Sequence, residues 1–243
     1  MPSDASKLPE EVVEVPSEAR AAGPSDDHVA IALRGFGPLG ILAILVILAG
    51  NFLFVPLSAV LVLVWVRWSR TPWREIGYVR PRSWTLTLSV GIVFGVAFKF
   101  LMKAIVMPLL GADPINQAYH HLAGNTAALP AAIYAMIVVA GFGEETVFRG
   151  YMFERLGKLF GSGVWAKTLV VLLASALFGL AHYAVQGLAG VQQATLVGLV
   201  YGAIFAITGR IFMLMCAHAA FDLTALAMIY WNLESSVAHL VFK

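Results

Sequence analysis

Charged residues are scarce in this sequence. Only 12% of its 243 residues are Asp, Glu, Lys or Arg, whereas 60% are hydrophobic and the mean hydropathy is +0.82. Soluble domains carry about a quarter charged residues, so the composition excludes an ordinary soluble protein. The net charge is only +2, and the few basic residues are explained by membrane orientation. We therefore expect a lipid bilayer as a partner and no nucleic acid.

Cysteine is scarcer still, because Cys216 is the single cysteine of the sequence. An intrachain disulfide is therefore excluded. Cys216 lies in an apolar run, where a free cysteine behaves as a small hydrophobic residue. We interpret it as a packing residue of a helix.

Long apolar runs dominate the chain. A spanning helix needs about 20 apolar residues, and we expect spans over residues 84–109, 129–153, 165–186, 190–208 and 211–231. A further block, 36–66, would form a helix of roughly 46 Å against a hydrocarbon core of about 30 Å. Gly50 and Asn51 near its middle predict a turn between two short helices. The fold class is therefore all-α, a polytopic transmembrane helical bundle of about seven spans, within a range of six to eight.

The basic residues indicate how the bundle is oriented. The loop after the first block contains Arg67, Arg70, Arg74, Arg80 and Arg82, whereas the loops 110–128 and 187–193 contain no Lys or Arg. Short loops rich in basic residues stay in the cytoplasm. We therefore expect residues 1–35 to be a disordered acidic cytoplasmic tail and residues 36–66 to be a membrane hairpin. If the first block is one helix instead, the tail lies on the outside.

Ionisable residues inside the predicted spans carry the functional signal. Each carboxylate or arginine at mid-membrane costs about 3 kcal/mol on insertion scales, so such groups must pair or face a wet cavity. Three spans contain them: Glu144, Glu145 and Arg149 on one, His182 on the next, and His218 and Asp222 on the last. Lys99 and Lys103 lie in the outer half of another span, and we expect them to extend to the outer interface.

Helical spacing assigns different roles to the two glutamates. Glu145 and Arg149 are four residues apart, about 40° around the helix axis, with the acid before the base, which is the favourable order for an ion pair. Glu144 points about 100° away from Glu145 and is less committed to that pair. Glu144 is therefore the candidate general base.

Two other pairs share a helix face by the same spacing. His218 and Asp222 are four residues apart, and Phe178 and His182 are too, which places an aromatic ring beside an imidazole.

Each of these groups has a purely structural interpretation when taken alone. The Glu144, Glu145 and Arg149 set could be an ion pair near the cytoplasmic end of its span. His182 could be a hydrogen-bonded core histidine, and His218 with Asp222 could link two helices. Their occurrence together on three helices indicates a functional site.

The motifs EExxxR, FxxxH and HxxxD on successive helices resemble those of the CAAX-protease and bacteriocin-processing family, also called CPBP or Abi. In this sequence they are Glu144, Glu145 and Arg149, then Phe178 and His182, then His218 and Asp222. The stretch EIGYVRPRSW is similar to a segment that often precedes the core of the family. The resemblance covers residues 67–232, and we expect residues 67–243 to form a CPBP-like protease core. Family members have Asn or Asp at the last motif position, and Asp222 lacks the amide donor that Asn would offer.

The resemblance implies a multi-pass intramembrane endopeptidase of a bacterial inner (plasma) membrane that cleaves a membrane-associated protein or peptide. Glu144, helped by His182, would activate a water molecule. His218 would stabilise or protonate the tetrahedral intermediate, oriented by Asp222. Glu145 and Arg149 would hold the architecture together, and Phe178 would contact substrate.

A zinc mechanism is the alternative that the resemblance leaves open. Glu144, His182, His218 and Asp222 would then supply the nitrogen and oxygen ligands. No HExxH sequence is present to bring two ligands and a base together on one helix. We therefore expect the glutamate mechanism, with no cofactor.

Two other functions are compatible with buried Glu and His residues. A proton-coupled transporter also buries such groups, but it predicts internal repeats and interrupted helices in matching halves, which the sequence does not display. A non-catalytic scaffold or immunity protein would keep the fold and would not need Glu144. The residues do not select the substrate, its prenylation or the oligomeric state.

Overall fold

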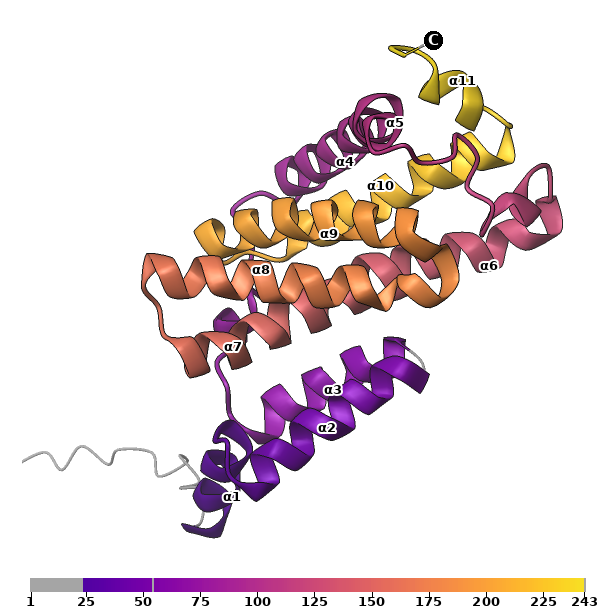
Figure 1. The fold of residues 1–243 in the computed structure, drawn as a ribbon. Helices are drawn as coiled ribbons and strands as arrows, with labels where there is room; N and C mark the ends of the chain where they lie inside the picture. Colours follow the sequence, from indigo (N-terminus) through magenta and orange to yellow (C-terminus); the bar gives the residue numbers. More distant parts are fainter. Residues whose placement is uncertain (1–23, 54, 243) are drawn as a thin grey trace, which may run out of the picture.

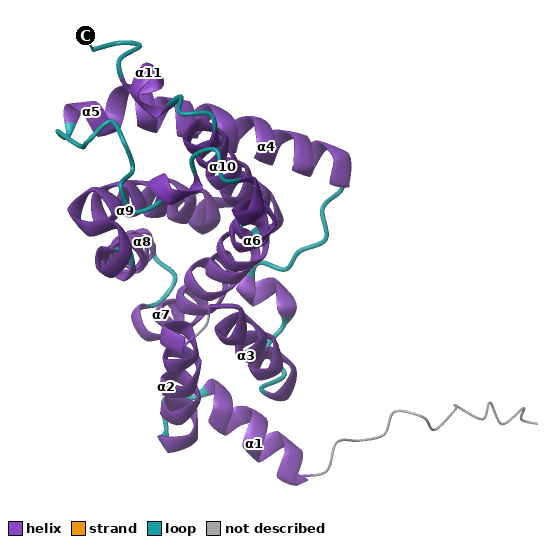
Figure 2. Cartoon of the chain, turned by 90° about the vertical axis from the view of Figure 1, so that its right-hand side faces the viewer, coloured by secondary structure: helices purple, strands orange, loops and turns teal. Residues whose placement is uncertain are grey.

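The computed structural model describes residues 24–53 and 55–242, and the described part of the chain is helical without any strand. Figure 1 shows a bundle of long helices, and Figure 2 shows the same helices with the loops that join them. The predicted fold class, a polytopic transmembrane helical bundle, is confirmed.

Three helices form the N-terminal part of the described chain: α1 (Pro24–Arg34), α2 (Pro38–Leu53) and α3 (Val55–Trp68). Helices α2 and α3 lie side by side (Figures 1 and 2), and the Ser58 hydroxyl donates to the carbonyl of Ile47 over 2.8 Å. The indole of Trp65 donates to the carbonyl of Leu33 over 3.0 Å, which ties α1 to α3. Both α2 and α3 are shorter than the roughly 20 residues of an ordinary span, as expected for a hairpin of short helices.

The structure of this region differs from two predictions made from the sequence. The range 24–34, which the sequence placed in a disordered tail, is helical, whereas residues 1–23 lie outside the described part. Gly50, expected at the turn, lies within α2, which continues to Leu53. A Cβ on Gly50 would lie 3.5 Å from the Cα of Ser58, so this glycine allows α2 and α3 to approach closely.

Five helical segments in the described chain are long and apolar enough to cross a membrane: Trp84–Leu109, Thr126–Phe160, Val164–Ala181, Tyr183–Thr208 and Phe212–Tyr230. They correspond to the five spans predicted after residue 83. A sixth is possible by length and composition if α1 and α2, bent by 58°, form one broken span. The remaining difference from the predicted seven reflects the short helices of the N-terminal hairpin.

The first of these segments contains α4 (Trp84–Leu101) and α5 (Met107–Leu109), and the second contains α6 (Leu129–Tyr134) and α7 (Met152–Phe160). Between α6 and α7, residues Ala135–Tyr151 form a helix of π type, with wider turns than an α-helix; we call it the wide helix. The last three segments are α8 (Val164–Ala181), α9 (Tyr183–Thr208) and α10 (Phe212–Tyr230), followed by the short α11 (Glu234–Ala238).

Helix α10 lies at the centre because glycines let its neighbours approach its backbone. A Cβ on Gly91 of α4 would lie 2.8 Å from the carbonyl oxygen of Met213, and one on Gly95 would overlap the carbonyl oxygen of Ala217. On the wide helix, a Cβ on Gly141 would lie 3.0 Å from that of Ala219. Two helices that carry glycine at the contact therefore fix α10 in position.

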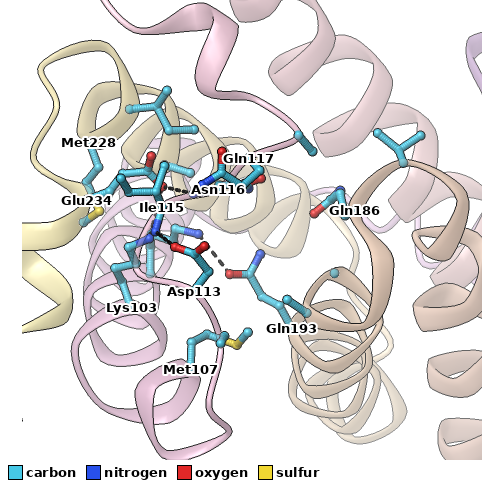
Figure 3. A pocket seen from close by; sticks show the side chains of 18 residues that line it. Lys103, Met107, Asp113, Ile115, Asn116, Gln117, Gln186, Gln193, Met228 and Glu234 are labelled. Atoms are coloured by element: carbon cyan, nitrogen blue, oxygen red, sulfur yellow. Dashed lines mark hydrogen bonds and ion pairs between the residues drawn. The ribbon is translucent and has the colours of Figure 1, made fainter.

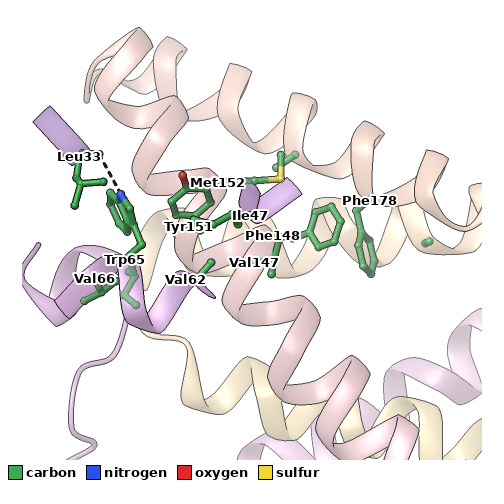
Figure 4. Packing of buried hydrophobic residues seen from close by; sticks show 13 residues of the cluster. Leu33, Ile47, Val62, Trp65, Val66, Val147, Phe148, Tyr151, Met152 and Phe178 are labelled. Atoms are coloured by element: carbon green, nitrogen blue, oxygen red, sulfur yellow. Dashed lines mark hydrogen bonds between the residues drawn. The ribbon is translucent and has the colours of Figure 1, made fainter. Parts of the chain in front are cut away.

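A buried hydrophobic cluster connects the N-terminal helices to the core (Figure 4). The rings of Trp65 on α3 and Tyr151 on the wide helix meet edge to face, with centroids 5.0 Å apart. Further along the cluster, Phe148 meets Phe178 of α8 at 4.9 Å in the same geometry. Such pairs add to the stabilisation by burial, so the wide helix is held between α3 and α8.

The expectation that Lys99 and Lys103 extend to the outer interface is wrong. Their exposed fractions are 5% and 9%. Lys103 bonds to Glu234 of α11 over 3.1 Å and to the carbonyl of Pro114 over 2.5 Å. The loop 110–119 and α11 cover this end of α4, so both lysines point into protein rather than toward the interface.

The close packing of α4 on α10 can be tested with the smallest side chain. We expect Gly95→Ala to destabilise the protein by about 1–3 kcal/mol, because the added methyl group overpacks a helix contact. The matched control is Gly157→Ala, since nothing lies within 4 Å of a Cβ there. Thermal unfolding in detergent should show a lower Tm for Gly95→Ala only; equal Tm values for both variants would contradict the packing.

Candidate active site

Three helices bring the predicted motif residues together. The wide helix contributes Glu144, Glu145 and Arg149, and α10 contributes His218 and Asp222. Helix α8 contributes Phe178 and ends one residue before His182. Among these residues, Glu145 is fully buried.

Glu145 accepts contacts from two helices. Its Oε1 lies 2.8 Å from Nη1 of Arg149 on its own helix and 2.7 Å from Nδ1 of His218 on α10. The helical spacing predicted the first contact, whereas the second joins residues 73 positions apart. Because Arg149 and His218 are both buried, Glu145 is committed to these two partners and is not free to act as a base.

Aromatic rings enclose the Arg149 guanidinium. Its central carbon lies 4.5 Å from the ring centroid of Phe178 and 5.5 Å from that of Tyr201 on α9. Cation–π contacts are strongest where water is excluded, and Arg149 is only 2% exposed. The wide helix, α8 and α9 therefore converge on this one cation.

His218 is oriented by its contact with Glu145. The carboxylate of the ion pair can only accept, so Nδ1 of His218 carries the proton. This places Nε2 on the other side of the ring, 3.8 Å from Oε2 of Glu144 and 3.7 Å from Oδ2 of Asp222. The Glu145 contact thus aims Nε2 between two carboxylates.

His182 is oriented by the backbone. Its Nδ1 lies 2.8 Å from the carbonyl oxygen of Phe178, and a carbonyl can only accept, so Nδ1 is the donor. In the neutral ring Nε2 then has a free lone pair. The ring of Phe178 meets those of His182 and His218 edge to face, with centroids 4.7 Å and 5.9 Å away.

Glu144, His182, His218 and Asp222 line one cavity of about 420 Å³. That size lies within the range of small-ligand sites. Oε2 of Glu144 is buried and has no hydrogen-bond partner among the described residues. Phe178 also lines the cavity but is only 2% exposed; it packs against both histidines, and its contact with substrate stays a prediction.

Several polar residues of the cavity wall were missed by the sequence reasoning. They are Lys99 on α4, Asn116 and Tyr119 in the loop before α6, and Gln186 and Gln193 on α9. Of these residues, only Lys99 had a sequence signal for a place in the cavity wall, because it is a charged residue inside an apolar run. The others lie far from the motifs, and nothing local distinguishes them from ordinary polar residues.

Tyr119 places a phenol on the wall of this cavity. Burial raises the pKa of Tyr119, and the nearby carboxylates of Asp222 and Glu144 raise the pKa further. Its hydroxyl therefore keeps its proton at neutral pH. The hydroxyl oxygen accepts a long contact, 3.4 Å, from the Gln186 amide.

The wide helix is also fixed next to Glu145 by a tyrosine of the arginine-rich loop. The Thr146 hydroxyl donates to the carbonyl of Phe142 over 2.7 Å, so it accepts from the Tyr78 hydroxyl, 2.8 Å away. Burial raises the pKa of Tyr78, which keeps this hydroxyl a donor.

The four residues of the zinc alternative do not form a metal centre as they stand. Within residues 24–53 and 55–242, no three His, Cys, Asp or Glu side chains come close enough together to hold an ion. Nδ1 of each histidine is bonded, to Phe178 for His182 and to Glu145 for His218, so only the Nε2 atoms could face an ion. Because the side chains do not gather around one point, the mechanism below uses no metal.

Comparison with known proteins gives one match. Residues 126–224 match the family model described as Rce1-like, type II CAAX prenyl endopeptidase Rce1-like. Neither a curated protein nor a solved structure matches the chain significantly. The matched segment contains every motif residue, from Glu144 to Asp222. The resemblance stated from the motifs is thus confirmed: residues 126–224 of this multi-pass membrane protein match the model of the Rce1-like CAAX prenyl endopeptidases.

Proposed function

We propose that this protein is an intramembrane endopeptidase that hydrolyses a peptide bond of a membrane-associated protein or peptide through a water molecule activated by Glu144. The observation that carries the proposal is the buried, unpartnered Oε2 of Glu144 on the wall of a cavity shared with His182, His218 and Asp222. A buried polar atom without a partner is costly, and a water bound in the cavity would satisfy it. The family match supports the class of reaction.

Glu144 and His182 act on the water in this mechanism. The water donates one hydrogen to the Glu144 carboxylate and the other to the lone pair on Nε2 of His182. As its oxygen attacks the scissile carbonyl carbon, Glu144 takes the proton. When the C–N bond breaks, the proton passes to the leaving nitrogen, so one water is consumed and a carboxylic acid and an amine are released.

His218 and Asp222 act on the tetrahedral intermediate. A protonated His218 donates from Nε2 to the oxyanion, while Nδ1 stays bonded to Glu145 and the ring keeps its orientation. Asp222, 3.7 Å from Nε2, helps to hold that proton. Donors fixed in advance, in a site shielded from water, stabilise the charge that develops in the transition state.

The cavity also indicates where substrate enters. Its wall contains Asn116, Tyr119 and His121, all from the loop 110–128. This loop lies at the opposite end of α4 from the arginine-rich loop. We propose entry of a bilayer-associated peptide beneath the loop 110–128, in a bacterial inner membrane, with prenylated peptides as the first class to test.

The role of Glu144 is tested by an isosteric change. Glu144→Gln should lower kcat/KM for a fluorogenic membrane-associated peptide by about 10²–10⁴-fold, because general-base catalysis is lost. Glu75→Gln is the matched control, since this exposed carboxylate pairs only with Lys158, at 3.6 Å, away from the cavity.

Cleavage that persists in Glu144→Gln would refute Glu144 as the base and leave room for the scaffold interpretation. A chelator arm separates the metal alternative: activity lost with a chelator and restored by zinc would contradict the proposed mechanism.

The buried ion pair gives a prediction that separates stability from activity. Arg149→Met should cost about 3–5 kcal/mol, because Glu145 loses the cation of its buried ion pair and keeps only His218. In Glu145→Met with Arg149→Met both charges of this pair are removed, so the double variant should recover much of the Tm. It should stay inactive, because His218 loses the acceptor for Nδ1. An active double variant would show that the Glu145 contact does not orient His218.

A further inference from the structure

Lys99 is a buried cation with little compensation. It lies within the first long apolar segment and is 5% exposed. Its ammonium donates to Oε1 of Gln193 over 3.1 Å and lies 4.7 Å from the ring centroid of Phe221. No carboxylate of the described residues lies within 4.0 Å. One amide oxygen and one ring face leave this three-donor group without an anion.

Lys103, one helical turn further on, has what Lys99 lacks. Its ammonium is paired with the carboxylate of Glu234 at 3.1 Å and bonded to the carbonyl of Pro114. The same Oε1 of Glu234 accepts from the backbone N–H of Asn116 over 3.1 Å. The protein thus supplies a carboxylate in contact with Lys103 but only an amide oxygen in contact with Lys99.

Lys99 also lies where two cavities meet. It lines the cavity of Glu144 and a second one of about 490 Å³, and Asn116, Gln186 and Gln193 line both as well. Figure 3 shows the second cavity, with Asp113, Gln186 and Gln193 facing it and Lys103 paired with Glu234 at its edge. The shared amides can bond to peptide N–H and C=O groups, so the second cavity suits a stretch of peptide next to the cleaved bond.

We propose that Lys99 binds a carboxylate of the substrate peptide and so sets which bond lies against Glu144. This rests on the proposed function. Glu144 and Asp222 line the same cavity and repel an incoming anion, whereas Lys99 attracts one. The carboxylate is either the C-terminal group of the peptide or an acidic side chain near the cleaved bond. The proposed occupant is a peptide because Lys99 lines the same cavity as the proposed catalytic residues.

The test compares matched peptides on the full-length protein in detergent. The probes are acylated fluorogenic peptides of mixed sequence in three sets: C-terminal acids, the same peptides as C-terminal amides, and amides with added internal aspartates. Wild type should cleave at least one carboxylate set at least tenfold better than plain amides, which is the usual effect of a hydrogen bond to a charged group. The two carboxylate sets identify which source is used.

Variants assign the preference to Lys99. Lys99→Met should abolish the preference without lowering the Tm, because it removes a buried charge that has no anionic partner. Lys99→Arg should keep it, and Lys167→Gln, which removes an exposed lysine outside the catalytic cavity, should leave it unchanged. Equal cleavage of all sets by wild type, or an unchanged preference in Lys99→Met, would overturn the proposal.

Binding separates this proposal from the proposed function. The affinity of the three peptide sets is measured on Glu144→Gln, alone and combined with Lys99→Met. A preference for carboxylate that needs Lys99 supports the subsite even if no peptide is cleaved by wild type. Binding without preference overturns the subsite while leaving the peptidase intact.

Discussion

The structure depends on one buried carboxylate, that of Glu145. A buried charge is tolerated only when it is paired and hydrogen-bonded, and Glu145 obtains its partners from two helices, Arg149 on the wide helix and His218 on α10. Arg149 in turn lies against Phe178 of α8 and Tyr201 of α9. These contacts join the wide helix, α8, α9 and α10 around one buried ion pair, so the four helices are held in one arrangement. Stability and the orientation of His218 therefore have the same physical origin.

Adjacent glutamates can have different roles because helix rotation separates their environments. Glu145 is fully buried and is paired through Oε1 with Arg149 and His218, whereas Glu144 lies on the cavity wall. His218 lies between them, with Nδ1 on Glu145 and Nε2 facing Glu144. The His218 imidazole thus links the two glutamates. In the proposed mechanism this contact gives the two consecutive acids different roles, with Glu145 structural and Glu144 reactive.

The sequence predicted what periodicity and hydropathy control. The lengths of the apolar runs predicted the five long spans, and the spacing of four residues predicted the Glu145–Arg149 ion pair. The contact of Glu145 with His218 was not predictable, because it depends on how closely α10 is approached at Gly95 and Gly141. The prediction that Lys99 and Lys103 reach the outer interface was wrong for a related reason. A lysine that reaches solvent and a lysine covered by protein look alike in sequence, and here the loop 110–119 and α11 cover both side chains. Helix α1 was not predicted because its sequence contains no long apolar run.

The charges of the cavity lead to an order of events at the proposed site. Glu144 and Asp222 line the cavity in which the proposal places the reacting carbonyl, and Lys99 lines both this cavity and the second one. Hydrolysis creates a new carboxylate on the acyl fragment beside these two acids, and like charges in a low-dielectric site repel strongly. The fragment on the far side of the cleaved bond carries an amine instead, and a carboxylate held by Lys99 would belong to it. If both proposals hold, the acyl fragment is expelled first, and the second fragment leaves only when its contact with Lys99 breaks.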